Sequence, residues 1–137
     1  MEAKELMIGD LVYNHRNWIC PIVEIHKDSA VVIAGHYGEE EFKLNDLRPI
    51  PLTPEILEKN DFVANKHVYP YPYYEYTNTK DKLKVGFAFP QGNRTSYKEP
   101  WIYIDSEYVF VEHLPCIYVH QLQHALKMCG IEKEIEL

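Results

Sequence analysis

Near its beginning the chain reads Met7-Ile8-Gly9-Asp10-Leu11-Val12-Tyr13, a glycine turn followed at once by a short apolar run. Similar runs recur as far as Ile50, and polar clusters such as Asn14-His15-Arg16-Asn17 and Gly35-His36-Tyr37-Gly38 separate them. Strand-sized runs that alternate with turns at a spacing of about 8–12 residues are typical of antiparallel sheets that curl into small barrels. We therefore expect residues 1–52 to form a small SH3-like antiparallel β-barrel, a fold analogy that implies no particular ligand.

After this barrel the sequence predicts a short helix, a second antiparallel sheet and a C-terminal helix. Thr53-Pro54-Glu55 combines a capping residue, a proline suited to the first turn and an acid that complements the helix dipole, which predicts a helix over residues 53–61. Aromatic and β-branched runs between turn residues predict the sheet within residues 62–114. Apolar residues at helical spacing predict a helix over residues 118–129. We expect a single α+β domain over residues 1–137.

Length, charge and cysteine content exclude several classes of protein. The chain of 137 residues has the size of one domain. Its 14 basic and 21 acidic residues give a formal net charge of −7, which opposes binding to free duplex DNA. No apolar run approaches the roughly 18 residues of a membrane span, and the charged start carries no secretory signal, so a cytoplasmic protein without a membrane partner is expected. The three cysteines lack C-x-x-C spacing and predict neither disulfides nor a thiolate zinc site.

Three stretches of the chain resemble a known group of proteins. They are Glu5-Leu6-Met7-Ile8-Gly9-Asp10-Leu11-Val12, Pro49-Ile50-Pro51-Leu52-Thr53-Pro54-Glu55 and Tyr118-Val119-His120-Gln121-Leu122-Gln123. Together they resemble small uncharacterised proteins of Bacteroidales genomes and of their phages and mobile elements. The resemblance leaves residues 62–112 uncovered and implies no activity. It implies a small intracellular protein of a mobile element that acts on a host component.

The most unusual composition lies at Tyr69-Pro70-Tyr71-Pro72-Tyr73-Tyr74-Glu75-Tyr76. Alternating prolines favour an extended path, and tyrosines offer flat faces with a polar rim. Such a segment could stack on a planar ligand or anchor a protein interface, and the alternative is a strand whose tyrosines cover the sheet. Arg94, in the polar loop 91–98, could bind a phosphate or carboxylate, and the alternative is a solvated hairpin loop. The ligand-binding or partner-binding residues predicted in this part of the chain are Tyr69, Tyr71, Tyr73, Tyr74, Tyr76, Arg94 and Trp101.

His120 and His124 stand four residues apart on the predicted C-terminal helix, nearly opposite its apolar stripe. This spacing places two imidazoles on one helix face, a geometry that can bind a divalent metal. A zinc site would need a third ligand such as His113 or Glu112, and Gln121 occupies the place of the glutamate in the metalloprotease H-E-x-x-H pattern. The alternatives are a solvated polar face or a ligand contact. We therefore keep both histidines as predicted binding residues and predict no cofactor.

No serine or cysteine has the sequence setting of a catalytic nucleophile. The sequence therefore favours a non-catalytic binding protein that acts on a host protein or complex. One alternative is a protein that sequesters a small nucleotide-like ligand between the tyrosine segment, Arg94 and the two histidines. A second alternative is a metal-dependent enzyme that uses His120 and His124. A homodimer is also open, since an edge strand from Glu132 to Leu137 could pair across a two-fold axis.

Overall fold

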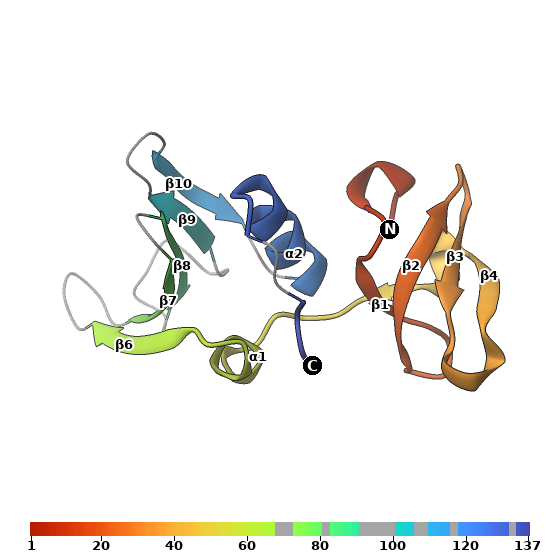
Figure 1. Ribbon diagram of the computed structural model, residues 1–137, viewed down its shortest axis with the longest axis horizontal. Helices are drawn as coiled ribbons and strands as arrows, with labels where there is room; N and C mark the ends of the chain where they lie inside the picture. Colours follow the sequence, from red (N-terminus) through yellow and green to blue (C-terminus); the bar gives the residue numbers. More distant parts are fainter. Residues whose placement is uncertain (68–72, 81–82, 91–100, 106–109, 116–117, 132–133) are drawn as a thin grey trace. The chain divides into compact units, whose positions relative to one another are not determined.

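In the computed structural model, whose elements are labelled in Figure 1, the chain divides into two compact units. The first unit comprises Met1–Pro51 and Tyr118–Met128, and the second comprises Leu52–Ile117 and Cys129–Leu137. The prediction of a single domain stays a prediction. For several residues of the second unit's strands the backbone alone is described. The residues that the structure describes are 1–67, 73–80, 83–90, 101–105, 110–115, 118–131 and 134–137.

The first unit is built on a five-stranded antiparallel sheet with the strand order β4-β3-β2-β1-β5. Three 3-10 turns accompany it, namely η1 (Ala3–Glu5), η2 (Gly35–Tyr37) and η3 (Leu44–Asp46). The prediction of an antiparallel sheet within residues 1–52 is confirmed, whereas the described strand pairs leave β4 and β5 at open edges and close no barrel. The strands are β1 (Leu11–Tyr13), β2 (Ile19–Ile25), β3 (Ser29–Ile33), β4 (Glu39–Lys43) and β5 (Arg48–Pro49).

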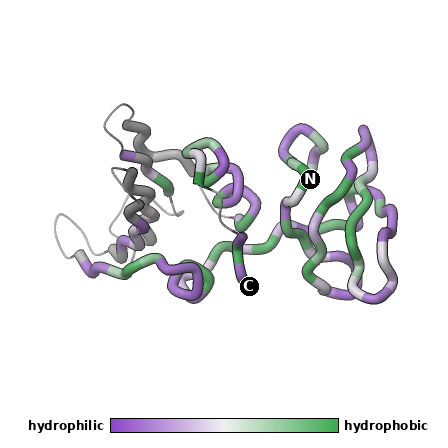
Figure 2. Tube along the Cα trace, in the orientation of Figure 1, coloured by the Kyte–Doolittle hydropathy of each residue, from purple (hydrophilic) through white to green (hydrophobic). Residues whose placement is uncertain are grey.

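One face of this sheet forms the core of the first unit. Val12 lies opposite Cys20 and Ile22 lies opposite Val32, and all four side chains are buried. Figure 2 shows hydrophobic residues, coloured green, along strands β2 and β3. Burial raises the pKa of the Cys20 thiol, which favours the inert protonated form. The buried apolar residues of this core are Leu6, Val12, Cys20, Ile22, Ala30, Val32, Ala34, Leu44 and Leu47.

Helix α2 (Val119–Met128) belongs to the first unit, although residues 52–117 separate it in sequence from the segment Met1–Pro51. The N–H of Val119 donates a hydrogen bond of 2.9 Å to the carbonyl oxygen of Ile50, which ties the start of the helix to the end of the sheet. Gly130 follows the helix with a φ of 70°, a left-handed conformation that glycine adopts without strain. The predicted apolar stripe is confirmed as buried at Val119, Leu122, Ala125 and Leu126.

The second unit contains a five-stranded antiparallel sheet in which each strand pairs with its neighbour in sequence, in the order β10-β9-β8-β7-β6. The predicted helix is confirmed as α1 (Pro54–Lys59), whose N-cap Thr53 accepts a hydrogen bond from the N–H of Ile56 at 3.3 Å. Neither helix of the described chain combines the length and the apolar character needed to cross a membrane. The strands are β6 (Val63–His67), β7 (Tyr73–Lys80), β8 (Leu83–Pro90), β9 (Trp101–Asp105) and β10 (Phe110–Pro115).

A buried asparagine joins the end of α1 to the C-terminal residues of the second unit. The Asn60 amide nitrogen donates to the carbonyl oxygens of Ile56 and Glu136, both at 2.8 Å. Its amide oxygen accepts the N–H of Glu136, also at 2.8 Å. Residues 134–137 form no strand, so the edge strand expected there is wrong for these residues, and with it the structural reason given for a homodimer.

Candidate functional site

Three segments that are distant in sequence bring arginine and aromatic side chains together on the first unit. Arg16 and Trp18 lie in the loop between β1 and β2, Tyr37 lies in η2 and Arg48 begins β5. The rings of Trp18 and Tyr37 stack with their centroids 5.7 Å apart at an angle of 20°. The Arg16 guanidinium carbon lies 5.0 Å from the Trp18 ring centroid and 4.9 Å from that of Tyr37. We call Tyr13, Arg16, Trp18, Tyr37 and Arg48 the Arg–aromatic surface.

A buried asparagine shapes the loop that carries Arg16 and Trp18. The Asn14 side-chain oxygen accepts the N–H of Arg16 at 2.9 Å and the N–H of Trp18 at 3.0 Å. The N–H of Asn14 also donates to the carbonyl oxygen of Trp18 at 3.0 Å. Asn17 has a φ of 62°, a left-handed conformation that asparagine tolerates better than most residues. These contacts give the two side chains a fixed backbone.

The second arginine sits on the neighbouring strands. Tyr13 of β1 lies opposite Ile19 of β2 and opposite Arg48 of β5. Because residues directly opposite each other project from the same face, these three form a row across the sheet. The Arg48 guanidinium carbon lies 5.5 Å from the Tyr13 ring centroid, and its Nη2 donates a hydrogen bond to the Asn17 side-chain oxygen.

The Arg–aromatic surface is exposed and positively charged. Trp18 is 39% exposed and Tyr37 is 64% exposed, and Ile19 beside them is exposed as well. Within the described ranges, neither guanidinium forms an ion pair with a carboxylate. Single exposed apolar residues are ordinary, whereas exposed aromatic rings grouped with arginines are typical of interaction sites. We therefore take this surface as the candidate functional site.

No local sequence pattern identifies this surface, although two signals point to it. Trp18 directly follows a polar turn that contains Arg16, and Tyr37 lies within a turn flanked by Gly35 and Gly38. An aromatic residue inside a glycine-flanked turn is poorly placed to reach a core, because turns run over the surface. Only the sheet order brings the two turns together.

The structure places the predicted binding residues of the second unit in several settings. Tyr69, Tyr71 and Arg94 lie outside the described residues. Tyr73 and Tyr74 belong to β7 and Trp101 begins β9, with only their backbone described. Tyr76 is a buried residue of β7, which agrees at this position with the alternative of a strand whose tyrosines cover the sheet.

His124 on helix α2 binds a buried carboxylate. Its Nε2 lies 2.9 Å from Oδ1 and 2.8 Å from Oδ2 of Asp10, which is 0% exposed. Since an ionised carboxylate only accepts hydrogen bonds, Nε2 carries the proton and donates it. Oδ2 of Asp10 also accepts the N–H of Met7 at 2.8 Å. Asp10 therefore closes its own turn and anchors α2 to it.

Two further side chains of α2 bind the same turn. The Gln123 side-chain oxygen accepts the N–H of Leu11 at 2.9 Å, and its amide nitrogen donates to the carbonyl oxygen of Gly9 at 3.0 Å. Lys127 Nζ donates to the carbonyl oxygen of Ile8 at 2.9 Å. We call these contacts, together with the pair formed by Asp10 and His124, the helix–turn latch. They give the polar face of α2 a structural role.

His120 is buried beside the helix–turn latch. It is 5% exposed, so the expectation of a solvated polar face is wrong at this residue. Its ring stacks on Tyr118 with centroids 5.7 Å apart, and it meets His124 edge-on at 5.6 Å. Its Nδ1 has no hydrogen-bond partner in the described part of the chain. Burial lowers the pKa of His120, and the nearby Asp10 carboxylate opposes that shift in part.

Among the described residues, His120 and His124 are not part of a cluster placed to bind a metal ion. In the ranges that the structure describes, no group of three or more His, Cys, Asp or Glu residues is placed to hold a metal ion. His113 and Glu112, suggested as third ligands, belong to β10 in the second unit, and only their backbone is described.

The lowered pKa of His120 predicts a loss of stability in mild acid. A histidine in the unfolded chain has a pKa near 6.5, above the pKa of His120 in the folded protein. As the pH falls through this value, the unfolded chain therefore binds more protons than the folded protein does. We expect the free energy of unfolding to decrease below about pH 6.5 and His120→Phe to flatten this dependence. Urea denaturation on both sides of this pH measures the effect. The control is His36→Phe at an exposed position, and an unchanged slope in His120→Phe would contradict the prediction.

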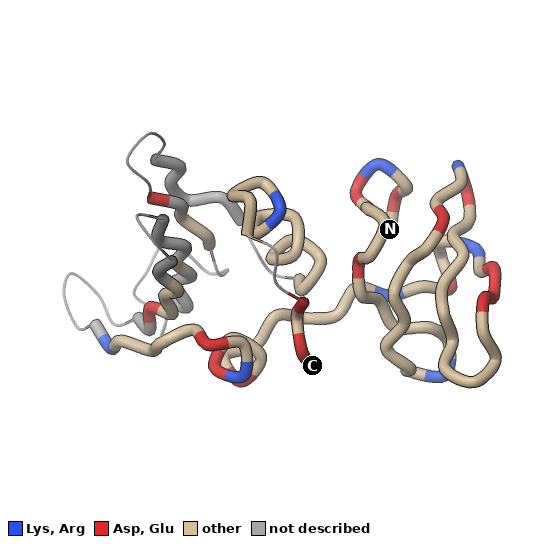
Figure 3. The backbone as a smooth tube through the Cα atoms, viewed as in Figure 1, with Lys and Arg blue, Asp and Glu red and all other residues tan. Residues whose placement is uncertain are grey.

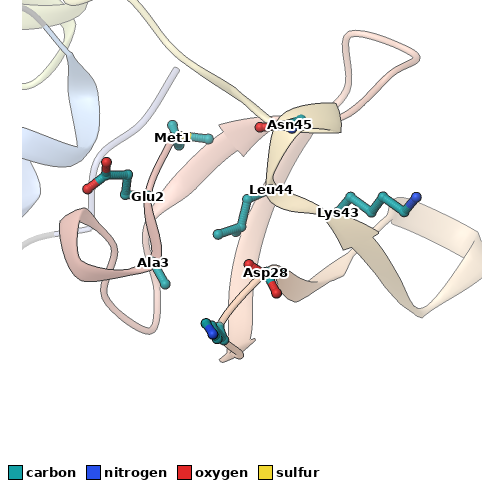
Figure 4. Close-up of a pocket in the computed structure, with 8 residues that line it drawn as sticks. Met1, Glu2, Ala3, Asp28, Lys43, Leu44 and Asn45 are labelled. Atoms are coloured by element: carbon teal, nitrogen blue, oxygen red, sulfur yellow. The ribbon is translucent and has the colours of Figure 1, made fainter.

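A pocket of about 430 Å³ lies elsewhere in the first unit (Figure 4). Figure 4 shows Leu44 directed into it from η3, with Met1 and Ala3 on the opposite side. Its charged residues are two acids and two lysines, and none of its described lining residues is aromatic, so it offers no ring on which a base could stack. None of the predicted binding residues lines it. The lining residues are Met1, Glu2, Ala3, Lys27, Asp28, Lys43, Leu44 and Asn45.

Comparison with known proteins adds no relative. No family model, curated protein or solved structure matches the chain. A functional interpretation therefore depends on the Arg–aromatic surface, because His120 is buried in packing contacts and His124 belongs to the helix–turn latch.

Proposed function

We propose that the protein is a non-catalytic binding protein and that the Arg–aromatic surface contacts a protein partner. The observation that carries this proposal is the exposure of two stacked rings, those of Trp18 and Tyr37, beneath the guanidinium of Arg16. Tryptophan, tyrosine and arginine are the residues that most often supply the binding energy of protein interfaces. The chain presents all three together on one surface.

The rigidity of this surface supports the proposal. The hydrogen bonds of Asn14 hold the loop of Arg16 and Trp18, and Arg48 is fixed by Tyr13 and Asn17. A surface that is ordered before binding loses less conformational entropy when a partner arrives. An exposed arginine on an aromatic ring stabilises a fold by only about 0.5–1 kcal/mol. Substitutions here should therefore affect binding more than folding.

We also propose that the first unit is an SH3-like barrel. The meander from β1 to β4, with β5 returning to pair with β1, provides the strand order that a small barrel needs before its edges meet. An NMR structure tests this. In a closed barrel β4 and β5 are neighbouring strands, so nuclear Overhauser effects between their backbone amide protons are expected. An open, flat sheet would contradict it.

We propose a host protein in the cytoplasm as the partner. This part of the proposal comes from the resemblance of the sequence to proteins of Bacteroidales phages and mobile elements. It determines the lysate in which the partner is sought.

Trp18→Ala should strongly reduce capture of the partner. With the tagged full chain in a Bacteroidales lysate, we expect one protein to be retained by the wild type and at least about tenfold less of it by Trp18→Ala, the loss typical of an interface hot spot. Calorimetry with the purified partner confirms direct binding. Met128→Ala, which removes another exposed apolar side chain, is the matched control. Equal capture by Trp18→Ala and Met128→Ala would contradict the proposal.

A further inference from the structure

We infer that the Arg–aromatic surface selects an acidic protein segment whose carboxylates bind the guanidinium groups of Arg16 and Arg48. This inference rests on the proposed function and specifies the chemistry of the partner.

The two arginines retain free hydrogen-bond donors. The chain contains 21 acidic residues, yet within its described part none pairs with Arg16 or Arg48. A guanidinium carries five N–H donors in its plane, and a contact through its face on an aromatic ring leaves these donors uncommitted. Arg48 donates one of its N–H groups to the Asn17 side-chain oxygen, while Arg16 is held by its contacts with two aromatic rings. Both groups are therefore oriented and still able to bind an acceptor.

The acceptor that fits these groups best is a carboxylate. The planar fork of arginine binds a carboxylate through two parallel hydrogen bonds. A phosphate can be held in the same way, but a nucleic acid would bring a continuous row of negative charges to a chain whose net charge is −7. Figure 3 shows acidic residues along β4, the strand that follows the turn of Tyr37. Their charge favours a partner with one or two acids over a polyanion.

Apolar side chains beside the arginines specify the rest of the partner. Trp18 and Ile19 are exposed next to the row formed by Tyr13 and Arg48. Burying them requires aliphatic or aromatic residues in the partner. The segment should therefore combine one or two Asp or Glu residues with apolar neighbours.

Selection from a random peptide library tests this inference. The full chain is immobilised, and the enriched peptides are expected to carry Asp or Glu at fixed positions beside apolar residues. For an enriched peptide, fluorescence anisotropy should show about tenfold weaker binding to Arg16→Gln and to Arg48→Gln, the loss expected for a charge-assisted hydrogen bond. Replacing the acid of the peptide with Asn or Gln should have the same effect. Arg16→Lys keeps the charge but not the planar fork, and should bind with intermediate affinity.

The controls separate this inference from general charge effects. Lys27→Gln and Lys43→Gln remove the same charge from exposed positions outside the surface and should leave the affinity unchanged. Enriched peptides without acids, equal binding to the arginine variants, displacement by a single-stranded oligonucleotide or a lack of any enriched peptide would each overturn the inference. If the lysate partner is nevertheless lost with Trp18→Ala, the proposed function stands and only the acidic specificity is wrong.

Discussion

Asp10→Ala should lower the free energy of unfolding by about 3 kcal/mol, because it removes a buried acceptor on which two hydrogen-bond donors depend. The substitution removes the acceptor of both the Met7 N–H and His124 Nε2 and leaves these partly buried donors without that partner. It also removes one of the side-chain contacts that hold α2 to the turn before β1, leaving those of Gln123 and Lys127. Urea denaturation measures the loss. Hydrogen exchange at the Leu11 amide, which is bound by Gln123, reports whether the helix–turn latch opens.

Two comparisons make this prediction specific. Asp46→Ala removes an exposed aspartate and should change the free energy of unfolding by less than about 0.5 kcal/mol. Asp10→Asn keeps the shape and an acceptor for Met7 but weakens the bond to His124, so an intermediate loss is expected. Equal stability of Asp10→Ala and Asp46→Ala would show that the helix–turn latch does not hold α2.

Asn60→Ala should lower the free energy of unfolding by about 2–3 kcal/mol, because it removes three side-chain hydrogen bonds that each contribute about 1 kcal/mol. The substitution removes the two bonds to Glu136 and the bond to Ile56. We expect residues 134–137 to detach from α1 and to become sensitive to carboxypeptidase. Thermal denaturation and digestion measure the two effects separately.

The effect of Asn60→Ala should depend on the C-terminal residues. Removing residues 134–137 takes away the partner, so Asn60→Ala should cost less in the shortened chain, with a coupling energy above about 0.5 kcal/mol in a double-mutant cycle. Asn45→Ala, at an exposed position, is the control substitution. Additive losses would mean that Asn60 stabilises α1 without holding the C-terminal residues.

Local patterns in the sequence predicted most of the secondary structure. The cap at Thr53 with Pro54 gave α1, because capping depends on residues within one turn. The apolar stripe of α2 gave the correct helix and its buried residues. The end of α1 was placed less well. The helix ends at Lys59 and not at residue 61 as predicted, since Asn60 lies near the bridge region and Asp61 is left-handed with a φ of 68°.

The contacts between distant segments could not be predicted. The spacing of His120 and His124 correctly predicted that they lie near each other. It could not predict which residues they contact, since the Asp10 partner of His124 lies 114 residues away in sequence. The Arg–aromatic surface was missed for the same reason. Trp18 and Tyr37 meet because β2 and β3 are neighbours in the sheet, and no local periodicity encodes that meeting.

The discontinuous first unit has a consequence for how the chain is made. The ribosome completes β1 to β5 before it has produced any of the residues of α2, and the whole span 52–117 must be synthesised in between. Asp10 stays without His124 during that interval, so the nascent sheet lacks the contacts that complete its unit. Closing such a long loop carries an entropic cost that precedes the gain from the new contacts. The first unit therefore cannot complete its contacts until α2 has been synthesised.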